Sequence, residues 1–98
     1  MRKNRDRVEI VADILEICKN DTRKTNIMYQ ANLSFELLTK YLRLLQHANL
    51  IKVDHDGSVY SATDKGLDFL KQYYELRHHT RIADEKRKVV EDSLSIPD

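Results

Sequence analysis

The chain has 98 residues, of which 41% are hydrophobic and 34% charged, with a formal net charge of +1 and a mean hydropathy of −0.62. These values suit one small folded domain and exclude intrinsic disorder, and no apolar run approaches the ~18 residues of a membrane span. Two Gly and one Pro favour a mainly helical fold, and the single Cys18 excludes an intrachain disulfide. Because no apolar signal region precedes the fold, we expect a cytoplasmic protein.

The positive charge is concentrated in the first half of the chain. Residues 1–49 carry nine Lys or Arg and six Asp or Glu, whereas residues 50–98 carry eight and ten. We expect residues 1–7 to form a basic N-terminal arm, which contains Arg2, Lys3, Arg5 and Arg7. A basic front on a nearly neutral chain points to a polyanionic partner.

Two helices are predicted before residue 32. Apolar spacing predicts the first from about Asp6 to Cys18, with a stripe of Val8, Val11, Ala12, Leu15 and Cys18 that Ile10, Ile14 and Ile17 widen. Turn-forming residues at 20–22 follow it, and a short second helix fits Lys24 to Ala31. Cys18 is therefore expected to be a small core residue.

The third helix, from Phe35 to about Ala48, has the clearest pattern in the sequence. Ser34 is suited to cap its start, and Asn49 is suited to end it. Leucines and Tyr41 form one broad apolar face. The opposite face is polar throughout, with Glu36, Thr39, Lys40, Arg43, Gln46 and His47.

A hairpin and a long helix are predicted in the second half. Two β-rich runs, 50–53 and 59–63, flank Asp56-Gly57, which is a strong hairpin signal. Thr63 is suited to cap a last helix that continues to about Ser93. Residues spaced by four and three form a coiled-coil seam on it: Phe69, Tyr73, Leu76, Thr80, Ala83, Arg87, Val90 and Leu94. Pairing would bury this seam, so we expect a homodimer.

This order of elements is typical of a winged helix-turn-helix domain. The stretch Lys24-Thr25-Asn26-Ile27-Met28-Tyr29-Gln30-Ala31-Asn32-Leu33-Ser34-Phe35 resembles the helix-turn-helix of small archaeal winged-helix proteins, as do Leu50-Ile51 and Thr63-Asp64-Lys65-Gly66. That family includes chromatin-associated DNA-binding proteins whose long C-terminal helices pair antiparallel. The predicted fold is mainly α with a small β-hairpin: a winged helix-turn-helix at 8–63, a dimerisation helix at 64–94 and a tail at 95–98.

The resemblance implies double-stranded DNA as the partner, bound by a homodimer. A helix in the major groove needs donors for base edges and cations for phosphates, which Ser34, Thr39, Lys40, Arg43 and Gln46 would supply. Arg23, Lys24 and the basic arm would support them on the backbone. The alternative reading is a solvated polar face with a solubilising tail. Two features depart from the family: the low net charge and the acidic Asp54 and Asp56 near the wing tip.

No motif for catalysis or for a cofactor is present. No metal site is predicted, because the adjacent His78 and His79 point about 100° apart on a helix and the other two His lie on different elements. The five Tyr lie on several elements and are expected to be packing residues. We therefore predict a non-enzymatic transcriptional regulator or chromatin-associated protein on the nucleoid. The alternative, favoured by the net charge and the acidic hairpin, is a dimeric winged-helix adaptor that binds proteins instead of DNA.

Overall fold

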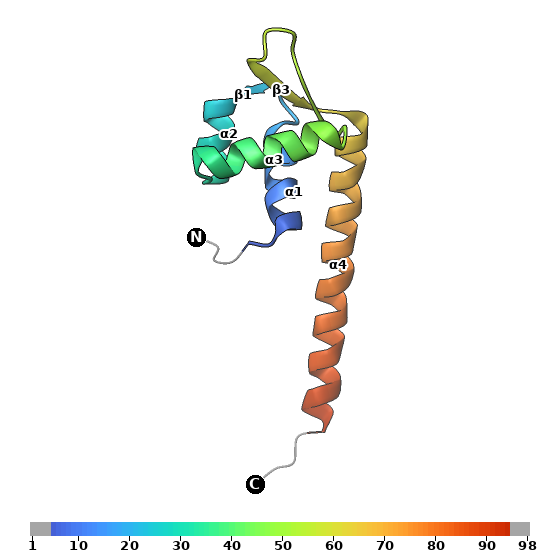
Figure 1. Cartoon of the computed structure of the whole chain (residues 1–98). Coiled ribbons are helices and arrows are strands. Elements are labelled where there is room, and N and C mark those ends of the chain that lie inside the picture. The colour runs from blue at the N-terminus through green and yellow to red at the C-terminus, as the bar shows by residue number, and fades with distance from the viewer. Residues whose placement is uncertain (1–4, 95–98) are drawn as a thin grey trace.

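The structure is a computed structural model that describes residues 5–94 (Figure 1). The elements run α1 (Arg7–Ile17), β1 (Thr22–Arg23), α2 (Lys24–Ala31), α3 (Phe35–His47), β2 (Ile51–Val53), β3 (Val59–Ala62) and α4 (Asp64–Ser93). Figure 1 shows the first three helices and the sheet gathered around one end of α4, which then continues alone. The described region measures 67 × 26 × 20 Å.

The core lies where α1, α2, α3 and the start of α4 meet. Its fully buried side chains come from every helix: Ile14, Leu15, Cys18, Ile27, Leu38, Leu45 and Leu70. On α1 the predicted stripe is buried, as are Ile10 and Ile14, which widen it, with the exception of Val8, which is 45% exposed. Burial raises the pKa of the Cys18 thiol to about 11, so it stays neutral. This confirms Cys18 as a core residue.

The sheet has three antiparallel strands in the order β1-β3-β2. Val53 pairs with Tyr60 on one side of β3, and Thr22 pairs with the same tyrosine on the other. The sequence predicts only the β2–β3 hairpin, because a strand of two residues is too short to show an alternating pattern. The Asp56-Gly57 turn is confirmed: Gly57 has a φ of 74°, and its N–H donates to the Asp54 carbonyl at 2.9 Å.

The helix ends follow the local signals in the sequence. The Ser34 hydroxyl accepts a hydrogen bond from the N–H of Leu37 at 3.1 Å, as an N-cap does. Asn32 and Asn49 adopt left-handed backbone conformations, with φ of 54° and 62°, after α2 and α3. Both the Ser34 cap and the Asn49 terminator agree with the sequence-based predictions.

The start of α4 is fixed against the end of α3. Thr63 caps α4 by accepting from the N–H of Gly66, and its hydroxyl donates to the Asn49 carbonyl at 2.6 Å. Lys65 Nζ donates to the Ala48 carbonyl at 2.7 Å. A Cβ on Gly66 would lie 2.1 Å from the Leu50 carbonyl oxygen, so only glycine permits this approach. The direction of α4 is therefore set by the domain.

The predicted seam on α4 divides into two parts. Phe69 and Tyr73 pack partly against the core of the same chain, beside the buried Leu70. From Leu76 onward the seam residues are exposed, including Thr80, Ala83, Arg87, Val90 and Leu94. Phe69 and Tyr73 thus already have partners within the chain, which periodicity does not distinguish from a seam.

Within residues 5–94, no helix is long and apolar enough to cross a membrane.

Candidate nucleic-acid interface

The outer face of α3 is a polar surface that the fold presents on its helix-turn-helix. Leu38, Tyr41, Leu42 and Leu45 turn inward and are buried. A helix places residues three and four apart on one face, so the opposite side carries the exposed Glu36, Lys40, Arg43 and His47. The tertiary packing thereby directs the two cations of α3 to solvent.

Lys40 and Arg43 are available to a partner. Within residues 5–94, neither side chain makes a hydrogen bond or an ion pair with another residue. Arg7 joins this surface, because Arg7 and Lys40 line the same hollow with Tyr41 and Leu44. The first helical residue of α1 thus adds a cation to the face of α3.

Lys24 and Thr39 are engaged with each other. Lys24 Nζ donates to Thr39 Oγ1 at 2.9 Å and lies 4.2 Å from the centre of the Phe35 ring. The Thr39 hydroxyl donates in turn to the Phe35 carbonyl at 2.8 Å. We call these three residues the Lys24 cluster. One N–H of Lys24 and the proton of Thr39 are used internally, and two N–H groups of Lys24 remain.

The other predicted contacts occupy the edges of this surface. Ser34 is exposed, and its oxygen caps α3. Gln46 is half-buried beside the exposed cations. Arg23 is exposed on β1, opposite Val59, and is the N-cap residue of α2 without a side-chain cap. The sequence places Arg23 at a helix start, and the structure adds its strand pairing.

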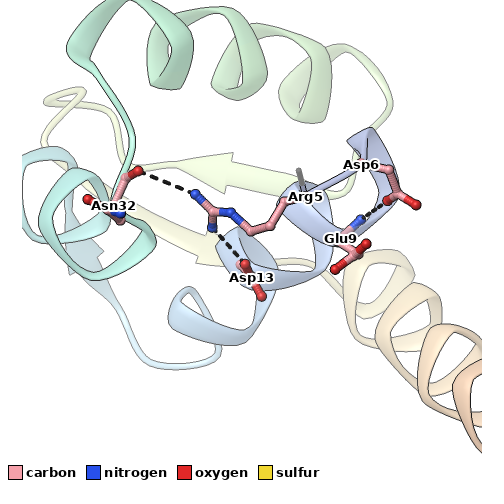
Figure 2. A network of polar contacts seen from close by, with 5 residues as sticks. All are labelled: Arg5, Asp6, Glu9, Asp13 and Asn32. Atoms are coloured by element: carbon pink, nitrogen blue, oxygen red, sulfur yellow. Dashed lines mark hydrogen bonds and ion pairs between the residues drawn. The ribbon is translucent and has the colours of Figure 1, made fainter. Parts of the chain in front are cut away.

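The structure differs from the predicted basic arm at two positions. Arg5 donates to Asp13 at 2.8 Å and to the Asn32 carbonyl at 3.3 Å, as Figure 2 shows. Its side chain is only 16% exposed, so this arginine joins α1 to the turn between α2 and α3. Arg7 belongs to α1. Arg2 and Lys3 lie outside the described residues.

One of the two acidic residues of the wing, Asp54, has a structural role in the turn between β2 and β3. The Asp54 carboxylate accepts from the N–H groups of Ser58 and Val59 at 2.9 and 3.1 Å. These backbone hydrogen bonds lower the pKa of Asp54. At the tip, His55 Nε2 lies 3.2 Å from Asp56 Oδ1, and both side chains are exposed. Asp54 therefore closes the wing turn, and its charge is directed at the backbone of that turn.

Two exposed aromatic side chains were not predicted as part of a site. Tyr29 on α2 is 87% exposed and Phe35 at the start of α3 is 61% exposed. The expectation that all five tyrosines pack is therefore wrong for Tyr29. Phe35 lies on the same side of α3 as the buried Leu38 and Leu42, so the helical period predicts that its ring is buried. The ring is exposed because Phe35 is the first residue of α3, at the edge of the core.

The arrangement supports recognition of an extended partner. Across residues 5–94, no three His, Cys, Asp or Glu side chains are grouped so that they would hold a metal ion. A convex helix with exposed cations and a neighbouring two-stranded wing matches a nucleic-acid surface more closely than a small-molecule pocket.

A family model described as winged helix-turn-helix matches residues 4–81. The chain belongs to the winged helix-turn-helix family. Among solved structures, this winged-helix chain is similar to Sso10a-2, a DNA-binding protein from Sulfolobus solfataricus. The two are 25% identical with a TM-score of 0.81, and the match covers 95% of this chain and 100% of that one. No protein of curated function matches the sequence.

Proposed function

We propose that the protein binds double-stranded DNA with α3 in the major groove. The observation that carries this proposal is the pair Lys40 and Arg43, exposed on the outer face of α3 without an internal partner in residues 5–94. A winged helix-turn-helix presents this helix to the groove, where Arg and Lys bind guanine edges or phosphates. The likeness to Sso10a-2, which is described as DNA-binding, supports the same activity.

The remaining cations are assigned to the DNA backbone. Arg7 shares a hollow with Lys40 and extends the positive surface toward α1. Arg23 and Lys24 stand at the N-terminal end of α2, where the helix dipole also favours phosphate. Ser34, Thr39 and Gln46 flank the cations on α3 as polar contacts. Arg2 and Lys3 complete the proposed arm, whereas Arg5 joins α1 to the turn of the helix-turn-helix.

We also propose that two copies pair through α4. Leu76, Val90 and Leu94 leave a large part of their apolar surface in water. Beside this seam, Val8, Tyr73 and Leu76 line a hollow whose rim carries the acids Asp6, Glu9 and Asp84 as well as the cations Arg77 and Arg81. The far end of α4 carries Lys86-Arg87-Lys88. An antiparallel partner would bring this basic segment near the acids of that rim and cover the apolar seam.

In an antiparallel pair centred between Thr80 and Ala83, each seam residue of one copy lies opposite a seam residue of the other. Leu76 then lies opposite Arg87, and Tyr73 opposite Val90. The two recognition helices would lie at opposite ends of the rod, far apart. This arrangement suits two duplexes, or two separated segments of one duplex. The proposed role is a transcriptional regulator or chromatin-associated protein on the cytoplasmic nucleoid, acting by binding rather than by catalysis.

Fluorescence anisotropy of a labelled duplex at several salt concentrations tests the DNA-binding proposal. The slope of log K against log salt is about −0.9 for each phosphate neutralised. Replacing both Lys40 and Arg43 with Ala should weaken binding and make the slope less steep by about two, because two cation contacts are lost.

A matched control removes two cations elsewhere. Lys19 and Lys71 are exposed, and neither lies on α3 or on the seam of α4. The K19A/K71A variant should bind with the wild-type slope. Equal slopes for wild type and K40A/R43A, with unchanged helix content, would remove α3 from the interface.

The second candidate is a dimeric adaptor without DNA binding. The net charge of +1 favours it, and so does the exposed acidic Asp56 at the wing tip. An intact dimer that fails to bind random and A·T-rich duplexes at about 50 mM salt, where electrostatic binding is strong, would favour this function.

A further inference from the structure

Phe35 is the one apolar side chain of α3 that the fold turns mostly to solvent. Its ring is 61% exposed, and it is the first residue of the helix, next to the Ser34 cap. Exposure of a phenyl ring to water is unfavourable. On the same side of α3, Leu38 and Leu42 are buried in the core, whereas Phe35 is not. The position leaves the ring free to contact an apolar group of a partner.

The ring is contacted by Lys24, whose ammonium group is itself held by Thr39. Lys24 Nζ lies 4.2 Å from the ring centre, at cation–π distance, and donates to Thr39. Thr39 follows Phe35 by one helical turn and donates to its carbonyl. Because the Lys24 cluster joins α2 to α3, the ring is positioned before any partner arrives, which reduces the entropy lost on contact.

The surroundings of the ring favour a nucleic acid over an apolar protein surface. Lys24 touches the ring, and Lys40 and Arg43 follow on the same helix. Helix α2 contains no acidic residue, and Glu36 is the one acid of α3. An aromatic ring in contact with a cation, on a helix pair with a single acid, complements a surface that is itself anionic and contains small apolar groups.

We propose that Phe35 contacts the 5-methyl group of thymine, so that the protein distinguishes methylated pyrimidine edges in the major groove. This inference rests on the proposed function and names what that site reads. The thymine methyl is the apolar group that base pairs present in the major groove, and Phe is among the side chains that contact it. Recognition helices direct their N-terminal residues to base edges, and Phe35 begins α3.

Lys24 acts beside the ring as a positioning residue. One of its N–H groups is occupied by Thr39, and the other two can reach a phosphate next to the contacted thymine. Lys24 thus couples a backbone contact to the orientation of Phe35. The DNA recognised is a duplex with thymine at the contacted step, with affinity supplied by the cations and discrimination by the ring.

Replacement of thymine by deoxyuridine tests the proposal, since it removes only the methyl group. Binding of the full-length protein to an A·T-rich duplex is compared with binding to the same duplex carrying deoxyuridine at every thymine. Burial of one methyl-sized group corresponds to about a fourfold change in affinity, so wild type should bind the thymine duplex about fourfold more tightly. Phe35→Ala should bind both duplexes equally.

Tyr29→Ala is the matched control. Tyr29 is an exposed aromatic residue on α2, outside the Lys24 cluster, and its removal should leave the thymine-to-deoxyuridine ratio unchanged. Phe35→Leu should keep most of the ratio, because an apolar side chain remains. Since Phe35 lies largely outside the core, circular dichroism should show wild-type helix content for both Phe35 variants.

A G·C duplex with and without 5-methylcytosine provides a second readout, because this methyl occupies the same place in the groove. Wild type should prefer the methylated duplex, and Phe35→Ala should not. If wild type binds the thymine and deoxyuridine duplexes equally, or if Phe35→Ala keeps the wild-type ratio, this inference fails while the proposed function stands. Absence of binding to any of these duplexes would overturn both.

Discussion

The winged-helix domain and the free part of α4 bury their apolar residues in different ways. In the domain, side chains from all four helices meet in one core, and Ile14, Leu38 and Leu45 are fully buried. Along α4 beyond Leu76, valines and leucines stay in water: Val89 is 66% exposed and Val90 61%. The radius of gyration of 17.8 Å exceeds the ~13 Å of a compact chain of this length.

The difference shows which part of the chain is complete by itself. The domain buries most of its apolar side chains with contacts inside one chain, apart from a few surface residues such as Tyr29 and Phe35, so its core forms without a second copy. The free part of α4 can do so only with another molecule, so its stability in a dimer must depend on concentration. Three substitutions test this comparison: one where α4 meets the domain, one on the free part of α4, and one at a hydrogen bond between α4 and α1.

The largest effect is expected at the junction. In Gly66→Ala, the new Cβ would meet the Leu50 carbonyl oxygen at 2.1 Å and Leu15 Cδ2 at 3.1 Å, so α4 must move away from the domain. We expect a loss of about 3 kcal/mol in the free energy of unfolding, measured by urea denaturation.

Gly57→Ala is the control for this substitution. Its Cβ meets no atom within 4 Å, and the cost is limited to the left-handed φ of 74°, about 1 kcal/mol. A Gly66→Ala protein as stable as Gly57→Ala would show that α4 is not held tightly against the domain.

An intermediate effect is expected on the rod. Val90 lies on the predicted seam, whereas its neighbour Val89 is equally exposed but turned to another side of α4. Val90→Ser should raise the dimer dissociation constant by about 100-fold, because two valines, one from each copy, lose their burial. Val89→Ser should have little effect. Sedimentation of both variants across a concentration series measures the difference, and identical dissociation constants would contradict the seam.

The smallest effect is expected between the two parts. Tyr74 on α4 donates to Glu16 on α1 at 2.8 Å, and this bond lowers the pKa of Glu16 below its usual 4.5. Burial, together with the same bond, raises the pKa of Tyr74 to about 12. Tyr74→Phe should lower stability by about 0.5 kcal/mol near neutral pH, since both groups are partly exposed.

The stability difference between wild type and Tyr74→Phe should depend on pH. Because Glu16 has a lowered pKa in the fold, its contribution is present above pH 4.5 and is lost as the pH falls. Because Tyr74 has a raised pKa, its contribution is present below pH 10 and is lost progressively as the pH rises from 10 through about 12. Wild type and Tyr74→Phe should therefore converge at both extremes in thermal denaturation. A constant difference would assign the effect to packing.

Local signals in the sequence were sufficient for most of the fold. Caps such as Ser34 and Thr63, and the Asp56-Gly57 turn, act within a few residues, so the sequence alone places them correctly. The strand β1 was missed because two residues carry no period. Phe69 and Tyr73, at the start of the predicted seam, also pack partly against their own core, which spacing alone does not reveal because residues that face a core and residues that face a partner have the same period.

The candidate site was harder to predict because it depends on contacts between distant residues. Lys40 and Arg43 followed from the polar face of one helix. The attachment of Arg5 to Asn32 joins residues 27 positions apart, and that of Lys24 to Thr39 joins residues 15 apart. The exposure of Phe35 depends on where α3 leaves the core. No pattern along the chain carries this information.

The rigid junction at Thr63–Gly66 has a geometric consequence for the proposed dimer. Each residue of a helix advances by about 1.5 Å and turns by about 100°. Inserting one residue into α4 before the seam would separate the two recognition helices by only a few ångströms more, but would rotate each of them by more than a quarter of a turn. The number of residues in α4 therefore determines the angle between two bound duplexes far more strongly than the distance between them.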